Sequence, residues 1–111
     1  MKLPYYILDV FTRDRLAGNP LAVVLKADGL SGARMQAIAG EFNLSETVFV
    51  LAPQNERHTN TLRIFTPTRE LPFAGHPTIG AAVLLGLNSR LSALRLELGV
   101  GSGYQQFEFE R

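Results

Sequence analysis

Hydrophobic residues in this chain fall into short strand-like runs and two longer helical patterns. Runs of aromatic, β-branched or alternating apolar residues predict six strands, over residues 5–11, 21–25, 47–51, 62–66, 94–98 and 107–111. A different pattern occupies residues 32–42, where apolar side chains recur at helical spacing, at Met35, Ile38, Ala39 and Phe42. Because Ser31 is a good N-cap and Asn43 a plausible stop, we expect an outer helix over residues 32–42.

A second helix is predicted over about residues 78–87. The segment from Ile79 to Leu87 is apolar on every side, which is typical of a helix buried all round. It is too short and too rich in glycine to span a bilayer. The stretch before it, Glu70–Gly80, has the character of a turn that feeds into the helix, and Pro77 suits the first helical turn.

These elements predict an α+β fold in a single domain, residues 1–111. Strands precede and follow a helix that is too apolar for a surface position. We therefore expect one lobe in which a curved, mostly antiparallel sheet is rolled around the central helix at 78–87, with the helix at 32–42 outside. In this arrangement the start of the central helix, with His76, lies at an open end of the roll.

Composition narrows the possible partners and chemistry. A net charge of +1 gives no electrostatic footprint for nucleic acid or an anionic membrane. The chain has no cysteine, so it forms no disulfide or thiolate metal site, and the N-terminal residues have no signal-peptide pattern. Two histidines without ligand spacing indicate no metal, and nucleotide-binding motifs are absent. We expect a cytoplasmic protein without a cofactor.

Three polar residues are candidates for function, and each has a simpler interpretation. Glu46 lies at the entrance of an apolar strand, where partial desolvation favours proton transfer, although an acid at a strand end is commonly just exposed. His76 is either catalytic or a capping residue, and Asn19 either contacts a ligand or only forms a turn. Free N–H groups at the start of a helix attract anions. Together these features suit moving a proton on a small carboxylated substrate.

Three sequence blocks resemble the PhzF family of phenazine-biosynthesis-like proteins, in order and in spacing. They are Gly18-Asn19-Pro20-Leu21-Ala22-Val23, Asn43-Leu44-Ser45-Glu46-Thr47-Val48-Phe49, and the segment from Phe65-Thr66-Pro67 through Glu70-Leu71-Pro72-Phe73-Ala74-Gly75-His76-Pro77-Thr78-Ile79-Gly80. The resemblance implies a diaminopimelate-epimerase-like fold, in which two similar lobes each wrap a sheet around a helix and the active site lies between them. It also implies an isomerase that works by proton transfer without metal or organic cofactor.

The resemblance assigns roles to individual residues. Glu46 matches the general acid/base of the family, and His76 matches the motif at the start of the central helix, so both are expected to be catalytic. Substrate binding is implied for the neighbouring motif positions and for the Gly-Asn-Pro block: Asn19, Gly75, Pro77 and Thr78. The substrate class that follows is a small carboxylated metabolite.

The chain departs from the family in length, because it covers only the N-terminal lobe. A lone lobe would leave its inter-lobe face bare, and large exposed apolar faces usually mark interfaces. We therefore expect a homodimer in which a second copy replaces the missing lobe, or pairing with a separate second-lobe chain. Three functions stay open: an isomerase or epimerase, a non-catalytic binder of small carboxylates, and an interaction lobe that needs a partner.

Overall fold

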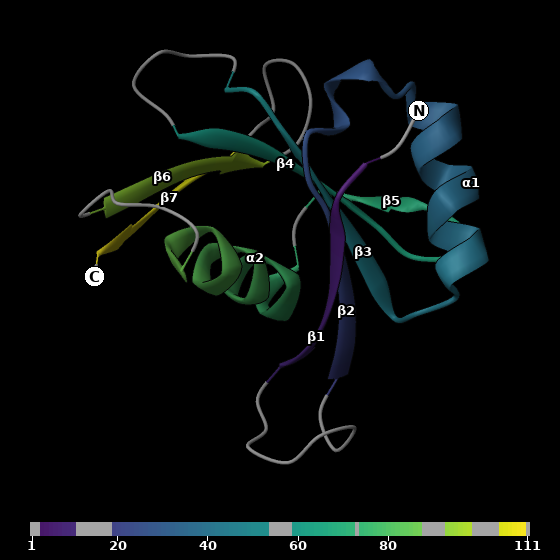
Figure 1. The fold of residues 1–111 in the computed structure, drawn as a ribbon, viewed down its shortest axis with the longest axis horizontal. Coiled ribbons are helices and arrows are strands. Elements are labelled where there is room, and N and C mark those ends of the chain that lie inside the picture. The colour runs from purple at the N-terminus through teal and green to yellow at the C-terminus, as the bar shows by residue number, and fades with distance from the viewer. Residues whose placement is uncertain are drawn as a thin grey trace.

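The computed structural model describes residues 3–10, 19–53, 59–72, 74–87, 93–98 and 105–110. Seven strands form one sheet: β1 Tyr5–Val10, β2 Asn19–Val24, β3 Glu46–Leu51, β4 Asn60–Phe65, β5 Glu70–Leu71, β6 Ala93–Leu98 and β7 Gln105–Glu110. Two α-helices accompany it, α1 Gly32–Phe42 and α2 Gly75–Leu87, with a short 3-10 helix at Ala27–Gly29. Figure 1 shows the sheet curving past α2, with α1 on its other side.

The strands lie in the order β1-β2-β3-β4-β6-β7, and the short β5 pairs with β4. The β2–β3 and β4–β6 pairs are parallel, and the other four pairs are antiparallel. A parallel pair needs a crossover connection, and α1 and α2 provide the two that occur here. Such crossovers are nearly always right-handed. Since β2 and β4 run in opposite directions while both crossovers move the same way across the sheet, the two helices fall on opposite faces.

Each face of the sheet has its own core. On one face α2 packs through Ala81, Ala82 and Leu84 against strand residues Leu21, Val23, Val48, Val50, Leu62 and Ile64. On the other face α1 packs through Met35 and Ala39 against Val24, Phe49 and Phe65. Alternating residues of β2, β3 and β4 therefore serve different cores, as the period of two in a strand requires.

The predicted fold class and the outer helix are confirmed. The protein is an α+β roll with a mostly antiparallel sheet, and α1 covers the predicted residues 32–42. The hydroxyl of Ser31 accepts a hydrogen bond from the Arg34 N–H at 3.1 Å, as an N-cap does. Asn43 ends the helix in the left-handed conformation, with φ of 52°.

The central helix starts earlier than the sequence predicted. The helix begins at Gly75, before the predicted Thr78, so Gly75 and His76 belong to its first turn. Pro77 lies in the first helical turn as expected, but the low helix propensity of Gly75 favoured a start after it. The strand β5 was not predicted either, because its two residues are defined only by pairing with β4.

The predicted burial of α2 on all sides is wrong for the described residues. One flank faces the sheet, where Ala81 is fully buried. The opposite flank exposes Ile79, which is 41% accessible, and Val83, which is 56% accessible and lies one helical turn further on. The hydropathy of a residue indicates whether its burial is favourable, whereas its exposure depends on which other residues surround it in the fold.

Candidate active site

Glu46 is the first residue of β3, at the strand entrance that the sequence predicted. Its Cα partner across the parallel β2–β3 pair is Leu21, which belongs to the core under α2. Because side chains alternate along a strand, Glu46 points to the same face as Val48, which is also part of that core. The side chain is half-buried, and its Oε2 atom is shielded from solvent. The carboxyl group therefore lies at the sheet end on the α2 face.

Asn19 lies on β2, the strand that pairs with the strand of Glu46. It is the first residue of β2, paired with Val10 of β1, and not in the turn before the strand as the sequence predicted. Asn19 precedes Leu21 by two positions, so its backbone lies about 7 Å along β2 from the residue that pairs with Glu46. The side chain of Asn19 lies outside the described part of the structure.

The first turn of α2 holds the other four predicted site residues, Gly75, His76, Pro77 and Thr78. The earliest N–H groups of a helix have no partner within it, and Pro77 has none to offer. The N–H groups of Gly75 and His76 are therefore the donors that this turn can direct to an anion. The side chain of His76 lies outside the described residues, so its assigned role stays a prediction.

Pro77 and Thr78 contribute to the first turn by packing. Pro77 is buried, and Thr78 is only 2% accessible. The Thr78 hydroxyl donates to the carbonyl oxygen of Ala74 at 2.8 Å, and the Thr78 N–H reaches the same oxygen at 3.4 Å. Ala74 in turn packs against the α2-side core. This hydroxyl is used inside the turn, so Thr78 supports the geometry of the turn.

A tight turn and an ion pair lie just before this segment. Thr66 accepts hydrogen bonds at its hydroxyl from the N–H groups of Thr68 and Arg69, at 3.2 and 3.0 Å. The Arg63 guanidinium donates two hydrogen bonds to the Glu70 carboxylate, at 2.8 and 2.7 Å. These hydrogen bonds raise the pKa of Arg63 above its usual value, and burial opposes them only in part. The sequence motif includes Glu70, but the role of Arg63 was not predicted.

The six predicted site residues thus form two groups. Asn19 and Glu46 lie on adjacent strands, two register positions apart, while Gly75–Thr78 share one helical turn, and α2 packs on the sheet face that carries Glu46. Within the described residues, no group of three or more histidine, cysteine or acidic side chains could hold a metal ion. None of the described helices is long and apolar enough to cross a membrane.

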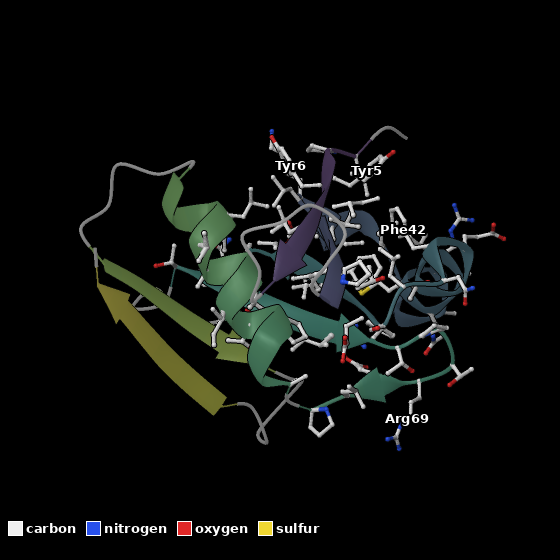
Figure 2. All side chains as sticks on the ribbon, turned by 90° about the horizontal axis from the view of Figure 1, so that it is seen from below. Tyr5, Tyr6, Phe42 and Arg69 are labelled. Atoms are coloured by element: carbon white, nitrogen blue, oxygen red, sulfur yellow. The ribbon has the colours of Figure 1, made fainter. Side chains whose placement is uncertain are left out.

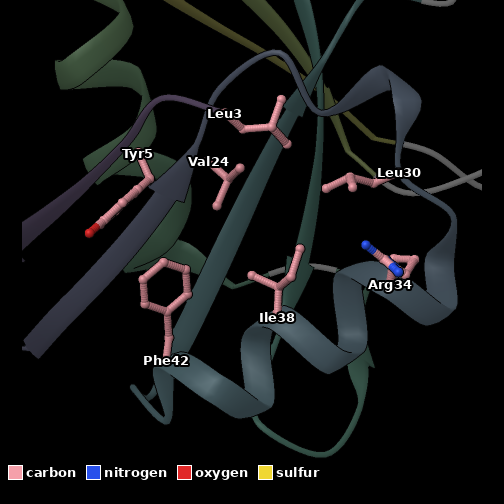
Figure 3. Close-up of a pocket in the computed structure, with 7 residues that line it drawn as sticks. All are labelled: Leu3, Tyr5, Val24, Leu30, Arg34, Ile38 and Phe42. Atoms are coloured by element: carbon pink, nitrogen blue, oxygen red, sulfur yellow. The ribbon is translucent and has the colours of Figure 1, made fainter. Parts of the chain in front are cut away.

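A cavity of about 240 Å³ lies on the opposite side of the sheet, between β1 and α1 (Figure 3). Most of the lining side chains are aliphatic or aromatic, Arg34 is the charged one, and the Tyr5 ring packs near Phe42 with centroids 5.3 Å apart. The lining residues are Leu3, Tyr5, Val24, Leu30, Arg34, Ile38 and Phe42. None of them is a predicted site residue, so this cavity is not the candidate active site.

The α+β roll and the motif at the start of α2 agree with the family comparison. Residues 8–109 match the profile of the family described as PhzC-PhzF, phenazine biosynthesis-like protein. The chain belongs to this family. The resemblance first seen in three sequence blocks therefore extends over nearly the whole chain.

Individual relatives include named isomerases. The chain is 67% identical over 81 residues to an uncharacterized isomerase of Mesorhizobium japonicum, covering 73% of this chain and 27% of the relative. It is 49% identical over 98 residues to the trans-2,3-dihydro-3-hydroxyanthranilate isomerase of Pseudomonas aeruginosa, covering 88% of this chain and 35% of that enzyme. The chain thus spans only about a third of the length of these relatives.

Solved structures share the fold. A PhzF-family protein of Enterococcus faecalis superposes with a TM-score of 0.82 at 36% identity, over 100% of this chain and 41% of that one. A predicted epimerase of Pseudomonas aeruginosa superposes with a TM-score of 0.77 at 38% identity, over 99% of this chain and 39% of that one. The diaminopimelate-epimerase-like architecture expected from the sequence is confirmed.

Proposed function

We propose that this chain forms half of the active site of a PhzF-type isomerase, which moves a proton on a small carboxylated substrate by general acid/base catalysis. Glu46 transfers the proton, and the N–H groups at the start of α2 bind the substrate carboxylate with His76 beside them. Asn19 contributes to substrate placement, Thr78 holds the turn that presents these N–H groups, and no cofactor takes part. We also propose a cytoplasmic location, which the absence of cysteine supports.

The position of Glu46 is the observation that carries this proposal. Its carboxyl group has one oxygen shielded from water, yet it stands at a strand end on the face against which α2 packs. Partial exclusion of water strengthens electrostatic interactions with a bound substrate. Support also comes from the relatives, several of which are named as isomerases.

In the proposed reaction Glu46 removes one proton from the substrate and returns one proton to it. As a carboxylate it removes a proton from a carbon of the substrate, and the electron pair left behind is delocalised toward the substrate's unsaturated system. As a carboxylic acid it then returns a proton to a different carbon, so the enzyme ends in its starting state. The helix N-terminus stabilises the negative charge that develops on the way.

A second candidate function is a binder or interaction lobe that depends on a second lobe for activity. The exposed flank of α2, formed by Ile79 and Val83, favours this alternative because adjacent exposed apolar side chains on one helix are suited to an interface. The proposed cover is a second copy of this chain in a homodimer, or a separately encoded second lobe. The short span relative to the named isomerases points the same way.

Isotope exchange tests the proposed function. The chain is incubated in D₂O with trans-2,3-dihydro-3-hydroxyanthranilate, the compound in the name of the Pseudomonas relatives, and deuterium in the product is measured by mass spectrometry. We expect incorporation that Glu46→Gln abolishes, a fall of at least about a hundredfold. Glu41→Gln, on the exposed side of α1, is the matched control and keeps full activity.

The outcomes separate the candidates. Full exchange in Glu46→Gln would remove Glu46 as the proton carrier. Binding of the compound without exchange, seen as thermal stabilisation of the wild-type chain, would favour the non-catalytic binder.

A further inference from the structure

Arg63 occupies a fork in the sheet. On the edge of β4 away from β3, Asn60–Leu62 pairs with β6 in parallel, whereas Ile64 and Phe65 pair with β5 in antiparallel fashion. Arg63 lies between these two pairings. One side of the fork continues the sheet, and the other begins the connection that leads into α2.

The branch formed by β5 is short. Only two residues, Glu70 and Leu71, pair with β4, which is too little to hold a strand by its backbone alone. Glu70 is fastened by the two hydrogen bonds from Arg63, while Leu71 packs into the core on the other face. The ion pair is therefore a main contact that keeps β5 against β4.

The ion pair is itself enclosed. The exposed fractions of the Arg63 and Glu70 side chains are 21% and 30%, and the guanidinium lies 5.5 Å from the centre of the Phe65 ring. Gly32, the first residue of α1, covers it, since a Cβ at this position would come within 3.2 Å of Arg63 Nη2. A paired, planar guanidinium fixed on several sides holds one geometry better than an exposed ion pair does.

The contact continues from Glu70 to the helix. Leu71 and Ala74 both pack against the α2-side core, and the Ala74 carbonyl oxygen accepts the hydrogen bonds of Thr78 in the first turn of α2. On the other side, Gln36 of α1 donates to the Thr66 carbonyl oxygen at 2.9 Å, which secures the turn before Glu70. The β4–β5 turn is thus linked to α1 by this hydrogen bond, and Leu71 and Ala74 share one core with α2.

We propose that Arg63 is a positioning residue, which clasps Glu70 at the fork and so fixes where the first turn of α2 lies. The effect of Arg63 on catalysis rests on the proposed function, because that turn presents Gly75 and His76. The effect of Arg63 on the position of the turn is independent of the proposed function. Arg63 itself lies on the α1 face of the sheet with Phe65, away from the face that carries Glu46, so it acts through β5 and touches no substrate.

Hydrogen exchange of the full chain tests the position of the turn. Amide exchange in peptides that cover residues 74–82 is compared with exchange in β2 and β3 for wild type, Arg63→Gln and Glu70→Gln. We expect both variants to exchange about tenfold faster in residues 74–82, with a smaller change in β2 and β3. Arg63→Lys, which keeps the charge but loses the paired hydrogen bonds, is expected to lie between them and wild type.

Arg69→Gln is the matched control. Arg69 is an exposed arginine in the same turn, and Figure 2 shows its side chain pointing away from the sheet. We expect wild-type exchange from this variant. Unchanged exchange at 74–82 in both Arg63→Gln and Glu70→Gln would overturn the proposal, as would an equal rise in every segment, which indicates general destabilisation only.

Catalysis provides the second readout. Arg63→Gln is expected to lower kcat more than it raises KM, with partial recovery in Arg63→Lys, whereas Glu46→Gln abolishes turnover but leaves exchange at 74–82 unchanged. If the wild-type chain shows no turnover, the proposed function fails while the exchange experiment still decides the role of Arg63. If turnover exists and Arg63→Gln leaves kcat at the wild-type value, the link to catalysis is wrong.

Discussion

The two helices of this protein pack on opposite faces of one sheet, yet their surroundings differ. The outer helix α1 is capped at both ends and tied by Gln36 to the β4–β5 turn, and its exposed positions carry small or charged residues. The central helix α2 is apolar from Ile79 to Leu87, and it exposes Ile79 and Val83 to solvent. Helix α1 is therefore complete within the described structure, while α2 has a flank suited to further contacts.

This difference shows how to distinguish structural from interaction surfaces. A surface helix normally carries charged or polar residues on its exposed side. Helix α1 places Arg34 and Glu41 there among small residues, whereas α2 exposes the larger apolar side chains of Ile79 and Val83. Because burying an aliphatic side chain contributes roughly 1.5–3 kcal/mol, leaving Ile79 and Val83 exposed forgoes stabilisation that a covering surface would supply.

Truncating a core side chain should give the largest loss of stability, and it allows the cores on the two faces of the sheet to be compared. Phe49 is fully buried under α1 and meets Phe65 edge-on, with ring centroids 5.4 Å apart. Phe49→Ala should lower the free energy of unfolding by about 3–5 kcal/mol, and Leu84→Ala in α2 by about 2–3 kcal/mol, because the open flank allows relaxation. Urea denaturation followed by circular dichroism measures both. Equal losses would show that the α2 core is as confined as the α1 core.

A charge on the open flank tests what covers it. If the proposed homodimer uses this surface, Val83→Asp should weaken dimerisation by at least about tenfold, since a carboxylate would be desolvated in the contact. Analytical ultracentrifugation across micromolar concentrations gives the dissociation constant. Ala37→Asp, at an exposed position of α1, is the control and should leave the dimer intact.

Two results would contradict this prediction. A wild-type chain that stays monomeric in this range would rule out the homodimer. A dimer that is equally stable with Asp at position 83 would place the interface elsewhere.

Loss of the N-cap gives the smallest expected effect, confined to α1. Ser31→Ala removes the hydroxyl that accepts from the Arg34 N–H, and should cost about 1 kcal/mol of stability. Thermal unfolding detects a change of this size. Ser45→Ala, at an exposed bend before β3, should stay within about 0.5 kcal/mol of wild type. A similar loss in both variants would mean that the cap adds nothing specific.

The ends of α1 could be predicted because local residues mark them. Strand β5 could not be predicted because it depends on contacts with residues outside its own segment. Ser31 and Asn43 mark the ends of α1 by their own side-chain and backbone preferences, so both ends were found. The start of α2 has no side-chain cap to mark it, which explains the error of a few residues at Gly75. The short β5 exists only through β4 and the Arg63–Glu70 pair, neither of which is local in sequence.

The candidate site was predictable where it depends on a motif or a strand end. Glu46 was located correctly at the entrance of β3, because a polar residue before an apolar run marks that point. Arg63 was missed, although one signal was available. It alternates with Phe65 on the strand face opposite Leu62 and Ile64, and a charge on a face that a helix covers requires a partner. The exposure of Ile79 could not be predicted, because it depends on neighbours in space.

The strand order has a consequence for how the chain folds. Apart from β5, every strand in the described structure lies next to the strand that precedes it in sequence, from β1 to β7. The sheet can therefore grow by adding each strand to the newest edge as the polypeptide emerges from the ribosome, without reopening earlier pairs. The β1–β2 hairpin and α1 can form while α2 is still being synthesised. The apolar central helix then reaches a curved surface that is already in place, which shortens the time it spends exposed to aggregation.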